Sequence, residues 1–136
     1  YYHLNKTLNQ TNADWVAMAV LTNGIVTNWG YHYSKLNWDF SVYEPTAVLP
    51  LGSLNAIDPI PLSVALFELH CDVNQPGITR ELSGYKVQFQ GVKFGNLLVA
   101  ILAVGYQENA PQTSLCHYID QLEAAMVHLV KPPTNK

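Results

Sequence analysis

The feature that most constrains the fold is the stretch of eight consecutive apolar residues at 97–104. A strand with one face in water alternates apolar and polar residues, whereas an unbroken apolar run is typical of a strand that is covered on both faces. Covering both faces requires helices above and below the sheet. The run therefore predicts the central strand of a sheet that lies between two layers of helices.

The residues before this run indicate two further strands. Residues 78–82 form one strand, Ser83-Gly84 forms a turn, and residues 85–90 alternate apolar with polar residues, as a half-buried strand does. The alternation slips at Gly91, which predicts a β-bulge at that glycine. Gly95-Asn96 then provides a hairpin turn into the apolar run.

A second hairpin signal lies near the N-terminus. The apolar run 15–21 is followed by Asn23-Gly24, a dipeptide preferred in two-residue hairpin turns, so a second strand is expected from residue 25 to about residue 31 or 33. Residues 32–58 show no sustained period. A connection of this length is either functional or hides a short element.

Three segments carry helical signals. Residues 1–13 place Leu4 and Leu8 on one side of a short helix. Residues 58–73 begin with an N-cap aspartate and prolines suited to a first turn, and residues 111–131 repeat apolar side chains at the spacing of an amphipathic helix. The element order predicts an α+β fold: a five-stranded antiparallel sheet with helices on both faces.

The whole chain, 1–136, is expected to form a single domain, because its length is close to the usual size of one. Residues 1–13 are its N-terminal segment and residues 131–136 its C-terminal tail.

The predicted central helix, 58–73, is apolar on two opposite faces. One stripe contains Leu62, Ala65, Leu66, Leu69 and Val73, and the opposite stripe contains Val64, Phe67 and Cys71. A helix that lies on its own sheet needs only one apolar face, and a second face left in water marks an association site. We therefore predict that the second stripe is an interface with another chain. The alternative is that the connection at 32–58 folds over it.

The charge of the chain excludes one class of partner. With 7 basic and 10 acidic residues, the net charge of -3 lacks the positive surface of a protein that binds nucleic acid or anionic lipid. No apolar run reaches the roughly 18 residues of a membrane-spanning helix, so a soluble domain is expected. Charged residues make up only 12%, which fits either a compositional habit of the source or a surface covered by a partner.

Three segments together resemble the roadblock or dynein-light-chain-type family and its longin and profilin-like relatives. Residues 15–26 resemble the opening strand, turn glycine and second strand of that family, residues 92–104 its closing hairpin, and residues 115–129 its final helix. The resemblance spans residues 13–130 and rests on patterning. The connection at 32–58 departs from the family, which passes quickly from its second strand to its central helix.

The resemblance implies a non-enzymatic module that forms a homodimer or a heterodimer with a similar domain. It implies that the contact is made by the central helix and the strand after it. It also implies a scaffolding or regulatory role with a small GTPase or a motor as partner.

Motifs of catalysis and cofactor binding are absent from the sequence. It contains no Walker-type loop, dinucleotide fingerprint, zinc-protease helix or nucleophile elbow. His70-Cys71 and Cys116-His117 are adjacent pairs, and neighbours on a helix diverge by about 100°, so each pair presents one ligand inward. The sequence thus predicts no metal site, no cofactor and no enzymatic activity.

An alternative function comes from aromatic residues between positions 29 and 43. Trp29, Tyr31 and Tyr33 would share one side of an extended segment, and Trp38 follows close behind. Such rings stack on sugars or contact Pro-rich peptides. The other interpretation is that they cover a sheet edge or fill an interface.

The cysteines and two glycosylation triplets point to different compartments. Cys71 and Cys116 are too few for a disulfide framework and are expected to be free thiols in the interior of a cytoplasmic protein. Asn5-Lys6-Thr7 and Asn9-Gln10-Thr11 are acceptor triplets for N-glycosylation. Secretion is therefore the alternative.

Overall fold

The computed structural model describes residues 2–20, 37–45, 47–69, 77–94, 97–107 and 114–129. Along the chain these residues form α1 (Tyr2–Thr11), β1 (Trp15–Val20), β2 (Asn37–Tyr43), α2 (Leu51–Asn55), α3 (Pro59–Glu68), β3 (Ile78–Leu82), β4 (Tyr85–Phe94), β5 (Leu97–Tyr106) and α4 (Cys116–Leu129).

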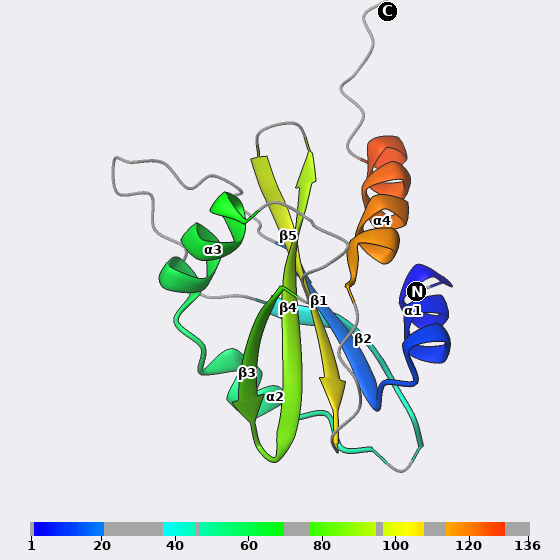
Figure 1. Ribbon diagram of the computed structural model, residues 1–136, viewed down its shortest axis with the longest axis vertical. Helices are drawn as coiled ribbons and strands as arrows, with labels where there is room; N and C mark the ends of the chain where they lie inside the picture. Colours follow the sequence, from blue (N-terminus) through cyan, green and yellow to red (C-terminus); the bar gives the residue numbers. More distant parts are fainter. Residues whose placement is uncertain are drawn as a thin grey trace, which may run out of the picture.

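The strands form one open antiparallel sheet in the order β2-β1-β5-β4-β3 (Figure 1). The apolar strand β5 lies in the middle, where it pairs with β1 on one side and with β4 on the other. The expected α+β fold with a five-stranded antiparallel sheet is confirmed.

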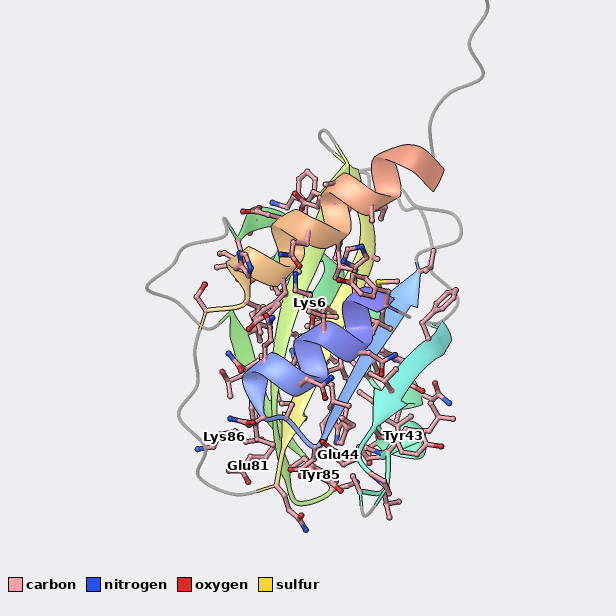
Figure 2. All side chains as sticks on the ribbon, turned by 90° about the vertical axis from the view of Figure 1, so that its right-hand side faces the viewer. Lys6, Tyr43, Glu44, Glu81, Tyr85 and Lys86 are labelled. Atoms are coloured by element: carbon pink, nitrogen blue, oxygen red, sulfur yellow. The ribbon has the colours of Figure 1, made fainter. Side chains whose placement is uncertain are left out.

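Helices cover both faces of this sheet, as the apolar run predicts. Helices α1 and α4 lie on one face, side by side in Figure 2, and α2 and α3 lie on the other face (Figure 1). Side chains of β5 contribute to both cores: Ile101 and Ala103 pack toward α3, and Leu102 and Val104 pack toward α1 and α4. The sheet is therefore the middle layer of three.

The second strand differs from the prediction. The described strand β2 begins at Asn37, inside the stretch expected to be irregular, and that stretch also contains α2. The predicted hairpin turn at Asn23-Gly24 and the strand after it lie outside the described residues. The prediction missed this strand although residues 37–42 alternate polar with apolar side chains, which is the pattern of a strand. Its pairing with β1 has an irregular register between Met18 and Val20.

Strand β4 is buried on both faces rather than on one. Gln88 and Gln90 are buried on the α1/α4 side, although their polarity suggested a solvent face. The β-bulge lies between Val92 and Lys93, not at Gly91. Gly91 instead makes room for the side chain of Leu98, because a Cβ atom at position 91 would come within 2.6 Å of it. Leu66 in α3 would be at an ordinary contact distance of 3.5 Å from that Cβ atom.

Helix α4 begins at Cys116 rather than near residue 111. The carbonyl of Leu115 accepts the first helical hydrogen bond, from the amide of Ile119 at 2.9 Å. The hydroxyl of Ser114 accepts a hydrogen bond from the amide of Cys116 at 3.2 Å. Pro111 suggested an earlier start, but the hydroxyl of Ser114 supplies the cap at the N-terminus of the described helix.

Trp15 and Gly105 are paired across β1 and β5, and the indole ring of Trp15 occupies the place where a Gly105 side chain would stand. Trp15 is fully buried and contacts Tyr85 edge-to-face, with 5.8 Å between ring centroids. The pair therefore allows a large ring to lie flat on the centre of the sheet.

We expect Gly105→Ala to lower the free energy of unfolding by about 1–3 kcal/mol or more, because the new methyl group overlaps the Trp15 ring. The matched control is Gly52→Ala in α2, where a Cβ atom meets nothing within 4 Å. That variant should keep or raise stability, because alanine favours helix over glycine. Urea unfolding of both variants measures the difference, and equal stability would contradict the packing described.

Candidate association surface

Helix α3 turns two apolar side chains toward solvent. Leu62 and Leu66 are fully buried against the sheet, while Val64 and Phe67 retain 37% and 40% of their accessible surface. Residues three apart on a helix lie on the same side, so Val64 and Phe67 form one outward patch, with exposed Pro61 beside it. We call these three residues the α3 surface.

Lys93 on β4 holds the end of this helix, a role that the sequence did not reveal. Its ammonium group donates hydrogen bonds to the carbonyl oxygens of Phe67, at 2.7 Å, and Leu69, at 3.3 Å. It also lies over the Phe67 ring, 5.6 Å from the centroid. Cations stabilise the carbonyl end of a helix and the face of an aromatic ring, so Lys93 fixes both the helix end and the Phe67 side chain.

This cap explains why α3 is shorter than expected. The helix ends at Glu68, whereas its apolar pattern continues to Val73. A sequence pattern cannot show that a lysine from a distant strand takes the terminal carbonyls. Cys71, predicted to share the stripe with Val64 and Phe67, follows the end of α3 and lies outside the described residues.

The alternative function, a ligand surface of aromatic residues between positions 29 and 43, receives no support from Trp38. Trp38 is buried, with 4% exposure, and its ring contacts Phe89 edge-to-face at 6.2 Å between centroids. It therefore belongs to the core between the sheet and α2. Trp29, Tyr31 and Tyr33 lie outside the described residues, and their role stays a prediction.

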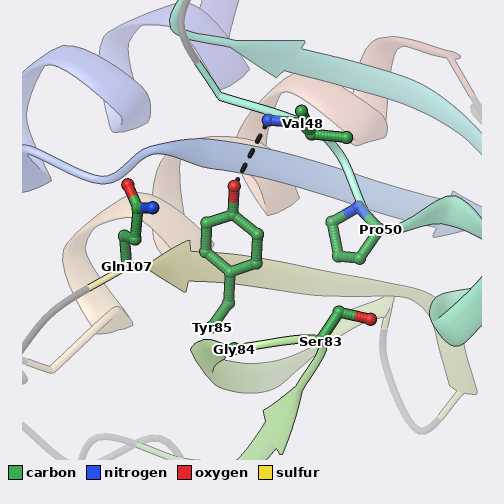
Figure 3. Close-up of a pocket in the computed structure, with 6 residues that line it drawn as sticks. All are labelled: Val48, Pro50, Ser83, Gly84, Tyr85 and Gln107. Atoms are coloured by element: carbon green, nitrogen blue, oxygen red, sulfur yellow. Dashed lines mark hydrogen bonds between the residues drawn. The ribbon is translucent and has the colours of Figure 1, made fainter.

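A cavity of about 330 Å³ opens at the other end of the sheet, and Figure 3 shows the residues that line it: Val48, Pro50, Ser83, Gly84, Tyr85 and Gln107. The Tyr85 hydroxyl accepts a hydrogen bond from the Val48 amide at 3.2 Å. The Ser83 hydroxyl is hydrogen-bonded to that of Ser53. The lining is uncharged and two of its hydroxyl groups already have partners, so it offers shape and neutral polar contacts rather than acid–base chemistry.

Metal-ligating side chains do not gather within the described part of the chain. No group of three or more histidine, cysteine, aspartate or glutamate residues there could hold a metal ion. Among the same residues, no helix is long and apolar enough to cross a membrane.

Tyr106 is a buried titratable group on the α1/α4 side, and its side chain is 2% exposed. Burial raises the pKa of its hydroxyl above the usual value of 10.0, and the nearby Thr11 hydroxyl opposes this rise in pKa. No hydrogen bond of ordinary geometry joins the Tyr106 hydroxyl to another described residue. Its burial is therefore the stronger influence.

Cys116 corrects the prediction of free thiols. It is 7% exposed and forms a disulfide bond. The sequence contains one other cysteine, Cys71, which is therefore its only possible partner within the chain. Cys71 lies between His70 and Asp72, and Cys116 lies between Leu115 and His117. Nothing in this local sequence distinguishes a buried thiol from half of a disulfide.

Comparisons with models of protein families, with curated proteins and with solved structures found no match to this chain. The functional argument therefore depends on the residues themselves.

We expect Lys93→Met to lower the free energy of unfolding by about 1–2 kcal/mol, because methionine keeps the aliphatic length but loses the charged hydrogen bonds to the end of α3. Amide exchange in the last turn of α3 should also become faster. Lys86→Met, on the same strand, is the matched control and should change neither quantity by as much. Unchanged exchange in α3 of the Lys93 variant would refute the capping role.

Tyr106 should make stability fall in alkaline solution. Its pKa is raised in the folded state, so its contribution is complete below about pH 10 and is lost as pH rises through the folded pKa. Tyr106→Phe should reduce the slope of unfolding free energy against pH by up to about 1.4 kcal/mol per pH unit in this range. Tyr43→Phe, which removes the hydroxyl of an exposed tyrosine, is the matched control. Urea unfolding between pH 8 and about pH 11 compares them.

Proposed function

We propose that this chain is a non-enzymatic association module of roadblock-like type that forms a homodimer through the α3 surface. The observation that carries the proposal is the exposure of Val64 and Phe67 on the outward side of a helix that buries Leu62 and Leu66 against the sheet. Phe67 is also held in place by Lys93, so the patch is ordered before a partner arrives. An ordered patch loses less side-chain entropy on association than a mobile one.

The position of the patch on the helix favours a second copy as the occupant. Val64 lies near the midpoint of α3, which spans Pro59–Glu68. If two α3 helices pack antiparallel about a two-fold axis at Val64, each Phe67 meets the partner's Pro61, which is also exposed. The patch is thus complementary to itself, as the interface of a two-fold dimer must be.

The edge strand β3 is a poorer site of association. Thr79, Arg80 and Glu81 are all exposed on it, and charged side chains on an edge strand oppose pairing with another edge. A symmetric antiparallel pair centred on Arg80 would place two arginines opposite each other. The helix, rather than the strand after it, is therefore the proposed contact.

The arrangement of elements supports the roadblock-like part of the proposal. The resemblance predicts a strand pair, a helix, three strands and a closing helix, and the described elements follow that order with α1 added before β1 and α2 added before α3. Association through the central helix corresponds to α3. A small GTPase or motor as a further partner stays an expectation from the resemblance alone.

The test is the solution mass of the full chain, measured by sedimentation over a range of micromolar concentrations. We expect a concentration-dependent dimer, and we expect Phe67→Glu to weaken its association at least tenfold, because it buries a carboxylate in an apolar contact. The variant keeps an exposed side chain at position 67, so its fold should persist.

Leu51→Glu is the matched control, because Leu51 has a similar exposed fraction, 43%, and lies on α2 rather than on the α3 surface. It introduces the same charge and should leave the dimer intact. A parent chain that sediments as a monomer throughout would refute the proposal. Equal weakening by both substitutions would show that charge, and not the α3 surface, controls association.

A further inference from the structure

Helix α1 carries two acceptor triplets whose asparagines face solvent. Asn5 and Asn9 are both exposed, whereas Thr7, the third residue of the first triplet, is 1% exposed. Asparagines four positions apart lie one turn apart on the same side of a helix. The two acceptor nitrogens therefore share one outward surface.

The threonines of the triplets point the other way and are used in packing. The Thr7 hydroxyl donates a hydrogen bond to the His3 carbonyl at 2.8 Å, and the Thr11 hydroxyl donates one to the Thr7 carbonyl at 2.6 Å. Leu4 and Leu8 are buried against the sheet beside them. Sugar chains attached to Asn5 and Asn9 would thus extend into water without disturbing the contacts that hold α1.

The disulfide bond at Cys116 is an independent indication of where this chain matures. Disulfides form and persist in the oxidising compartments of the secretory route and outside the cell, and they are rare in the cytosol. N-glycans are added in the same route. The sequence expectation of a cytoplasmic protein rested on free thiols, and the structure gives Cys116 no free thiol.

We infer that this chain matures in the secretory route with N-linked glycans on Asn5 and Asn9. The glycans would cover the outer side of α1 on one face of the sheet. The α3 surface lies across the sheet from them (Figure 1), so glycosylation and association through α3 are compatible.

The test is to express the full chain in one eukaryotic cell line in two forms. One form carries a signal peptide that directs it into the secretory route, and the undirected form has no signal peptide added and stays in the cytosol. Intact mass is measured before and after treatment with peptide N-glycosidase, and cysteines are tested by alkylation without reduction. We expect the secreted chain to lose two glycans on treatment, with Asn5 and Asn9 converted to aspartate. We also expect Cys71 and Cys116 to resist alkylation, and the undirected chain to have reduced cysteines and a lower melting temperature.

The variants separate the two sites from the fold. Asn5→Gln and Asn9→Gln should each remove one glycan, and the double variant should carry none. The melting temperature of each variant after deglycosylation should equal that of the deglycosylated parent. Changes at Thr7 are avoided because it is buried. A secreted chain with both asparagines unmodified would overturn the glycan assignment. Alkylatable cysteines, or retention of the directed chain in reduced form, would overturn the assignment of the compartment. Neither result bears on the sedimentation test of the α3 surface.

Discussion

The burial of β5 on both faces is the constraint on which the rest of the structure depends. An unbroken apolar strand has no side that can face water, so layers of helix are required above and below it. Its position between β1 and β4 makes it the shared wall of two cores, with Ile101 on one side and Leu102 on the other. Each face must then be closed by its own pair of helices.

The two faces are closed in different ways. On one side, α1 and α4 each present an apolar stripe, and buried polar groups such as Gln88 and Tyr106 lie among the apolar side chains. On the other side, the short helix α3 lies in contact with the sheet at Gly91, where Leu66 is at an ordinary contact distance and the glycine makes room for Leu98. Helix α3 contacts the sheet with one side only, the side of Leu62 and Leu66. The outward exposure of Phe67 follows from this geometry.

Lys93 contacts both helical layers, α4 on one face of the sheet and α3 on the other, at the point where the register of β4 is irregular. Its amide donates a hydrogen bond to the Glu123 carboxylate of α4 at 2.9 Å, while its ammonium group caps α3 on the opposite face. An irregular register between Val92 and Lys93 accompanies this outward hydrogen bond. The bulge is therefore part of the arrangement that positions the α3 surface.

The sequence predicted those features that depend on local pattern. The apolar run at 97–104, the Ser83-Gly84 turn and the one-sided helix around Leu4 and Leu8 are each decided by neighbours a few residues apart. Ser83 and Gly84 both have positive φ angles, as the tight hairpin turn requires.

The features that the sequence missed depend on distant contacts. The end of α3 depends on Lys93, and the burial of Gln88 depends on a helix that follows it in the chain. Strand β2 is an exception, because the alternation at 37–42 is a local signal and the prediction placed the second strand earlier in the chain. For the candidate site, the pattern identified Val64 and Phe67 but extended the stripe to Cys71, because periodicity does not show where a helix ends. The disulfide bond of Cys116 is likewise a tertiary fact.

The compartment and the partner constrain each other. A small GTPase or a motor, the partners expected from the resemblance, would have to share the compartment in which the chain matures, and a disulfide-bonded chain persists in an oxidising one. A second copy of the same chain is always in the same compartment. Glycans on α1 would also exclude partners from that face and leave the α3 surface open. The disulfide at Cys116 and the central position of Val64 on α3 therefore both support the proposal of a second copy as the partner, although they arise from unrelated parts of the structure.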